Sequence, residues 1–114
     1  MLTKLIPTSV SSLSGPALDW AVAKCKGWST HLPWDDRAQP STNWSQGGPI
    51  IEREKIDLCW HHVTNTVTAI KWFEGQNQQT ATTPLIAAMR CYVASKLGNE
   101  VEIPEELLEL HLSS

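Results

Sequence analysis

The sequence predicts an α+β fold, in which a small antiparallel sheet packs against two main helices and a short helix follows at the C-terminal end. Three observations predict it: two segments with a cap, an apolar stripe and a glycine stop; two β-branched and aromatic segments separated by turn residues; and a proline-led, leucine-rich end. A chain of 114 residues suffices for one modest core. We therefore expect residues 1–114 to form a single domain.

The first main helix is predicted between Ser14 and Gly27. Ser14 is a typical N-cap, Pro16 suits the first turn, and Gly27 supplies a left-handed stop. Apolar side chains between them recur at helical spacing on one face: Leu18, Ala21, Val22 and Cys25. Trp20 lies off this stripe, and we expect it to pack under a neighbouring loop.

The second main helix is predicted from Thr83, a cap residue, through Pro84 to a stop at Gly98. Its apolar face and its small alanines allow close packing, so we expect it to be the central core helix. The last segment begins at Pro104 with two glutamates, which favour the positive end of a helix, and continues with Leu107, Leu108 and Leu110. We expect this short helix to dock on the core or on a second subunit.

The sheet is predicted between the helices. Residues 56–62 and 66–74 are rich in β-branched and aromatic residues, which predicts two antiparallel strands joined by a turn at residues 63–65. Residues 27–36 can add a short edge strand. The polar stretch 74–83 is predicted as a surface loop.

Composition excludes several classes of function. The net charge is −3 and no two Lys or Arg residues are adjacent, which argues against binding of bulk nucleic acid or of an anionic membrane. No apolar stretch approaches a membrane span, and the apolar stretch near the start, broken by Pro7, is too short for a signal peptide. We therefore expect a cytoplasmic protein. The three cysteines have no disulfide or zinc-finger spacing, so we expect them to be reduced and mostly buried.

A candidate ligand site lies in the run NWSQGGP. If Gly48 caps a helix that starts at Pro49, backbone N–H groups near the glycine pair point at an anion, and Trp44 can stack a flat base. The predicted ligand-binding residues are Asn43, Trp44, Gln46, Gly47 and Gly48. The alternative is structural: the glycines make a tight turn and the indole fills the core.

Cys59, His61 and His62 suggest metal binding or nucleophilic catalysis. On a strand Cys59 and His61 share a face while His62 points the other way, so too few ligands converge for zinc. We predict no metal site and no cofactor, and we assign no catalytic residue. The alternative in another class is a small hydrolase or nucleotide-modifying enzyme that uses His61 or His62 as a general base.

Six tryptophans are more than one small core buries completely. We expect Trp44 and one of Trp20 or Trp28 to line a pocket or a subunit contact. Together with the leucine-rich end, these indoles predict a homodimer.

Three segments, in order, resemble the NinX-type family of small phage and prophage proteins, a domain of unknown function: LSGPALDWAVAKCKG, STNWSQGGPIIERE and TPLIAAMRCYVASKLGNEVEIPEEL. The resemblance implies a phage accessory protein that acts in the cytoplasm of the bacterial host, and it supplies no reaction. We expect a non-enzymatic protein that binds a small anionic ligand, such as a nucleotide derivative, or a host protein.

Overall fold

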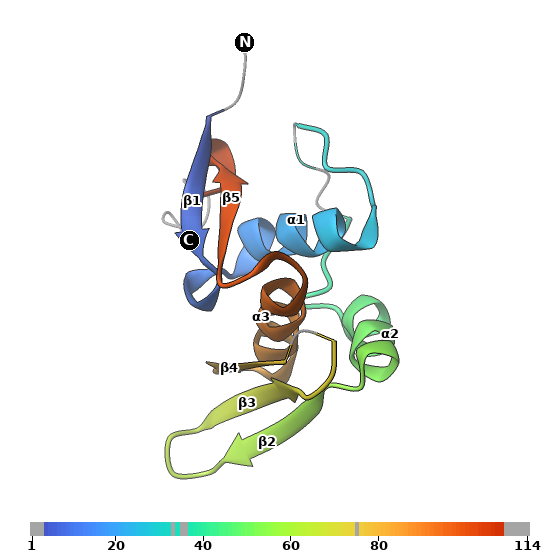
Figure 1. Ribbon diagram of the computed structural model, residues 1–114, viewed down its shortest axis with the longest axis vertical. Coiled ribbons are helices and arrows are strands. Elements are labelled where there is room, and N and C mark those ends of the chain that lie inside the picture. Colours follow the sequence, from blue (N-terminus) through green and yellow to red (C-terminus); the bar gives the residue numbers. More distant parts are fainter. Residues whose placement is uncertain (1–3, 33, 35–36, 75, 109–114) are drawn as a thin grey trace.

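The computed structural model describes residues 4–32, 34, 37–74 and 76–108. The chain folds into helices and two antiparallel sheets, so the predicted α+β class is confirmed (Figure 1). The elements, in order, are β1 (Leu5–Ser9), the 3-10 helix η1 (Val10–Ser12), α1 (Gly15–Lys26), α2 (Trp44–Glu54), β2 (Asp57–His61), β3 (Thr66–Lys71), β4 (Asn77–Ala81), α3 (Pro84–Leu97) and β5 (Glu100–Pro104).

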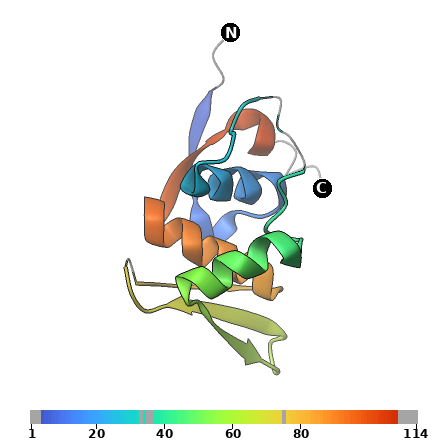
Figure 2. The ribbon, with the colours of Figure 1, turned by 90° about the vertical axis from the view of Figure 1, so that its right-hand side faces the viewer.

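Helix α3 is the centre of the molecule. It packs on β3 and β4 on one side and on α1 and α2 on others (Figure 1). Figure 2, which views the molecule from the side on which α2 lies, shows α2 in front of α3. The predicted boundaries are confirmed, because the Ile86 N–H donates to Thr83 Oγ1 over 3.2 Å and Gly98 ends the helix with φ of 91°. The buried residues of α3 are Leu85, Ala87, Ala88, Met89, Cys91, Tyr92, Val93 and Ala94.

Helix α1 is confirmed between Ser14 and Gly27, whose φ of 76° is left-handed. Burial extends beyond the predicted stripe, since every residue from Ala17 to Ala23 is buried. Trp20 is only 7% exposed and its Nε1 donates to the Thr30 carbonyl over 3.2 Å, so its predicted place under a loop is confirmed. Ser14 occupies the N-cap position without a side-chain capping bond.

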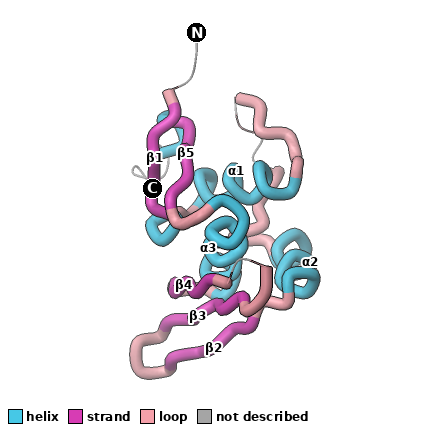
Figure 3. The backbone as a smooth tube through the Cα atoms, in the orientation of Figure 1, coloured by secondary structure: helices cyan, strands magenta, loops and turns pink. Residues whose placement is uncertain are grey.

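The strands form two separate groups (Figure 3). The predicted hairpin is confirmed: β2 and β3 are antiparallel, and the turn between them contains Asn65 at a left-handed φ of 56°. The second sheet was not predicted. It pairs β1 with β5 and so joins segments from opposite ends of the chain, with Val101 and Ile103 buried and the intervening glutamate exposed.

Two predictions about loops and strands were wrong. Residues 74–83 are not simply a loop, because β4 forms there and pairs with β3. Its side chains are mostly polar and only Ala81 is buried, so no apolar alternation marked it as a strand. Conversely, residues 28–32 and 34 form no strand, although they fall in the predicted edge strand.

The predicted start of the middle helix was also wrong. Helix α2 begins at Trp44, with Asn43 as N-cap, and Pro49 lies inside it. The glycine pair is therefore helical. Gly47 is needed for close packing, because an added Cβ would lie 2.6 Å from Leu85 Cδ2 and closer still to the Pro40 carbonyl oxygen. At Gly48 an added Cβ would meet only Trp44 Cε3, at an ordinary 3.7 Å.

The C-terminal helix is present in residues 105–108, where Leu107 is buried and 1% exposed. The described part of this segment thus docks on the core of its own chain, while Leu110 lies outside the described residues. Among the residues that the structure describes, no helix is long and apolar enough to cross a membrane.

Candidate functional site

A cleft of about 660 Å³ opens between the end of α1, the loop that follows it and one side of α2. Figure 2 shows this loop passing over α1 and descending to the start of α2. The lining residues are Lys26, Trp28, Ser29, Trp34, Arg37, Ala38, Ser45, Gln46, Pro49, Ile50 and Arg53.

The α2 wall of the cleft follows from helical spacing. Ser45, Pro49 and Arg53 are four residues apart and form one row along the helix, and Gln46 with Ile50 forms the neighbouring row. Because proline has no N–H, the helix lacks the bond from residue 49 to the Ser45 carbonyl. Together the two rows give this wall the cation of Arg53, the amide of Gln46, the hydroxyl of Ser45 and the apolar surface of Pro49 and Ile50.

The loop wall is fastened to both helices. Trp20 holds it to α1 through the hydrogen bond to the Thr30 carbonyl. Gln46 holds it to α2, because its Oε1 accepts from the Gln39 N–H over 2.7 Å and its Nε2 donates to the Arg37 carbonyl over 2.9 Å. Two side-chain anchors thus fix opposite ends of the loop, which favours a cleft that exists before any ligand arrives.

Asp19 supplies a third anchor from the buried surface of α1. It is 5% exposed, and its Oδ1 accepts from the Ser41 N–H over 2.9 Å. Burial raises the pKa of this carboxyl, and hydrogen bonding from Ser41 opposes that rise. Since Asp19 does not line the cleft, we assign it to holding the chain just before α2.

The charges and rings of the cleft suit a flat anion. Among the residues that the structure describes, three cationic side chains line it: Lys26, Arg37 and Arg53. Two indoles, those of Trp28 and Trp34, line the same space, and Trp28 is 38% exposed. Cationic side chains favour a phosphate or carboxylate, while an indole face can stack on a planar ring.

The residues predicted as a ligand site do not all face this cleft. Gln46 lines it. Asn43 caps α2 through its Oδ1, which accepts from the Ser45 N–H over 2.9 Å. Gly47 is buried against Pro40 and donates its N–H to the Asn43 carbonyl, so that donor is used within the helix.

Trp44 and Gly48 lie together on a different side of α2 from the cleft lining. The Trp44 side chain is 54% exposed and its Cε3 is the nearest atom to the Gly48 Cβ position. Of the two tryptophans, one of which was expected to line a pocket or subunit contact together with Trp44, Trp28 lines the cleft and Trp20 is buried. The sequence did not lead us to place Lys26, Trp28, Trp34 and Arg53 in a single site. The signal was there in part, as aromatic and basic residues interleaved between positions 26 and 37.

Cys59 and His61 lie on the three-stranded sheet, which is a separate region from the cleft. His61 Nε2 is 2.7 Å from Thr68 Oγ1, which is 2.8 Å from Thr80 Oγ1, so a row of polar contacts crosses all three strands. Cys59 is exposed, contrary to the expectation for the cysteines, whereas Cys91 is buried. In the described residues, no three His, Cys, Asp or Glu side chains are grouped as metal ligands.

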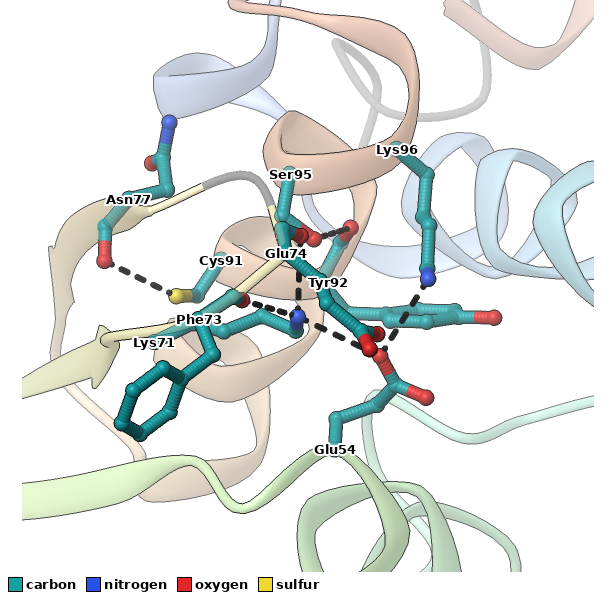
Figure 4. A network of polar contacts seen from close by, with 9 residues as sticks. All are labelled: Glu54, Lys71, Phe73, Glu74, Asn77, Cys91, Tyr92, Ser95 and Lys96. Atoms are coloured by element: carbon teal, nitrogen blue, oxygen red, sulfur yellow. Dashed lines mark hydrogen bonds and ion pairs between the residues drawn. The ribbon is translucent and has the colours of Figure 1, made fainter.

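A buried cation marks the junction of β3, α2 and α3 (Figure 4). Lys71 is 2% exposed, and its Nζ donates to the Phe73 carbonyl over 2.6 Å and to the Glu74 carbonyl over 3.0 Å. Glu54 lies 3.6 Å from this ammonium and 3.5 Å from that of Lys96. Because Lys71 is paired and does not line the cleft, the network reads as structural: it attaches the end of α2 to the sheet.

The thiols of Cys25, which is partly buried, and of Cys91, which is buried, are not activated. Burial raises the pKa of both Cys25 and Cys91 to about 11, so neither is a thiolate at neutral pH. Cys91 instead donates its S–H to the Asn77 carbonyl over 3.4 Å.

Comparison with known sequences gives one finding on ancestry. The sequence profile of the family described as Bacteriophage P22, NinX matches residues 9–96, which include α1, α2, the three-stranded sheet and nearly all of α3. A comparison with curated protein sequences gave no match.

Proposed function

We propose that this chain, which belongs to the Bacteriophage P22, NinX family, binds a small anion bearing a flat aromatic group, such as a nucleotide derivative. Membership of the family makes it a phage accessory protein. In the proposal its role is to capture the ligand in the cytoplasm of the bacterial host, without chemical turnover.

The observation that carries the proposal is the composition of the cleft. Lys26 and Arg53 approach it from α1 and α2, and two indoles share the space with them. A base stacked on an indole gains roughly 1–3 kcal/mol. Cationic side chains add attraction for the phosphate and orient it. The cleft is also large enough, at about 660 Å³, for a ligand of nucleotide size.

This site shares Gln46 with the one predicted from the sequence. The predicted site relied on backbone N–H groups at a helix start for the phosphate. The proposed cleft assigns that role to cationic side chains, and it assigns stacking to Trp28 and Trp34 in place of Trp44. Asn43, Gly47 and Gly48 then contribute indirectly, because they shape the helix that carries Gln46 and Arg53.

Calorimetric titration with a panel of mono- and dinucleotides tests the proposal. We expect saturable binding by at least one member, weakened at least about fivefold by Trp28→Ala. Arg53→Gln should weaken it too, whereas Lys4→Gln, the same loss of charge at an exposed residue outside the cleft, should not. If no member binds, or if Arg53→Gln and Lys4→Gln behave alike, the proposal fails.

A further inference from the structure

The strand β2 is an open edge of the three-stranded sheet. The strand order is β2-β3-β4, so β2 pairs with β3 on one side and with no described strand on the other. An edge strand presents unpaired N–H and C=O groups that can pair with another chain. Lysine and proline are among the residues that block such edges, and the sequence of β2, DLCWH, contains neither.

The side chains of β2 are also poorly covered. Helix α3 packs on β3 and β4, and the indole of Trp60 on β2 remains 57% exposed. Val63, in the turn after β2, is fully exposed. An open edge strand with exposed apolar side chains beside it is a site where a second chain adds both hydrogen bonds and buried surface.

The sequence of β2 is complementary to itself in antiparallel pairing. Successive residues of β2 face opposite sides of the sheet. One side carries Asp57, Cys59 and His61, and the other carries Leu58 and Trp60. When β2 is paired with a second β2 about Cys59, each Asp57 lies opposite a His61 and each Leu58 opposite a Trp60. Acid then meets imidazole twice and apolar meets apolar twice, and all five residues have a partner.

We propose that β2 pairs antiparallel with β2 of a second copy of this chain, with Cys59 at the two-fold axis. The result is a continuous six-stranded sheet, β4-β3-β2-β2-β3-β4, across a homodimer. The buried Leu107 docks within its own chain, so this edge replaces the leucine-rich end as the reason for a dimer. The inference is independent of ligand binding in the cleft.

The native thiol of Cys59 allows a direct test with a short bismaleimide added to the folded protein. We expect a covalent dimer on a denaturing gel, because opposed residues of paired strands lie within about 6 Å of each other. Cys59→Ser should abolish the cross-link. Cys25→Ser should retain it, since Cys25 is partly buried and has a raised pKa.

Sedimentation measures the same interface without a reagent. Trp60→Asp should weaken dimerisation at least about tenfold, while Trp44→Asp, at a comparably exposed indole on α2, should leave it unchanged. A wild-type monomer at high micromolar concentration, a dimer without the Cys59 cross-link, or a dimer indifferent to Trp60→Asp would each overturn the proposal. If Trp60→Asp does not fold, the cross-link on wild-type protein decides alone.

Discussion

Helices α3 and α2 lie side by side but are held in different ways. Helix α3 buries most of its residues, including Met89 and Val93 at no exposure at all. Helix α2 buries only Gly47 and Ile50. Its position instead depends on individual contacts: the close approach at Gly47, the ion pairs of Glu54 and the hydrogen bonds of Gln46. A helix held by few contacts keeps most of its surface open, and α2 uses that surface to form one wall of the cleft.

The largest effect should come from the buried helix. Met89→Ala removes a side chain with no exposure from the middle of α3, so we expect a loss of roughly 2–5 kcal/mol in the free energy of unfolding. Leu97→Ala on the same helix is the control, because that side chain is 37% exposed. Urea denaturation measures both, and equal losses would show that α3 is not the centre of the core.

The next effect tests the attachment of α2 to the sheet. Glu54→Gln removes the carboxylate beside the buried ammonium of Lys71, and we expect a loss of about 3 kcal/mol because a buried charge then lacks its counterion. Lys96→Gln breaks the other ion pair of the same carboxylate at a 36% exposed side chain, so its cost should be below about 1 kcal/mol. If thermal melts show the same loss of stability for both variants, the ion pair between Glu54 and Lys71 does not attach α2 to the sheet.

The contrast between the two helices also separates what the sequence could predict from what it could not. Thr83, Pro84 and Gly98 specify α3 locally, through a cap, a first-turn residue and a stop, and its apolar pattern is visible without the fold. Helix α2 carries misleading local signals. Its glycine pair and Pro49 are typical of a loop that leads into a helix, whereas the helix starts at Trp44, capped by Asn43, and continues through them.

Two further features depend on pairing between distant segments. Strand β4 has no apolar alternation, and only its bonds to β3 make it a strand. Strand β1 pairs with β5 across almost the whole chain, and Pro7 within it argues locally against a strand. The cleft was missed for a related reason: Trp28 and Arg53 line the same cleft because Trp20 and Gln46 fasten the loop that follows α1.

The smallest effects come from the glycine pair, where neighbouring residues of α2 should respond with opposite signs. Gly47→Ala places a methyl group against Leu85 and the Pro40 backbone, and we expect it to destabilise the fold by roughly 1–3 kcal/mol because the backbone cannot easily move away. Gly48→Ala meets only ordinary contact with Trp44. Alanine loses less conformational freedom than glycine on entering a helix, so this change should stabilise the fold by roughly 0.5–1 kcal/mol. Urea denaturation of the two variants compares them directly. A loss of stability in both would favour the tight turn that the sequence left open as the structural alternative, since only a non-helical backbone would require glycine at residue 48.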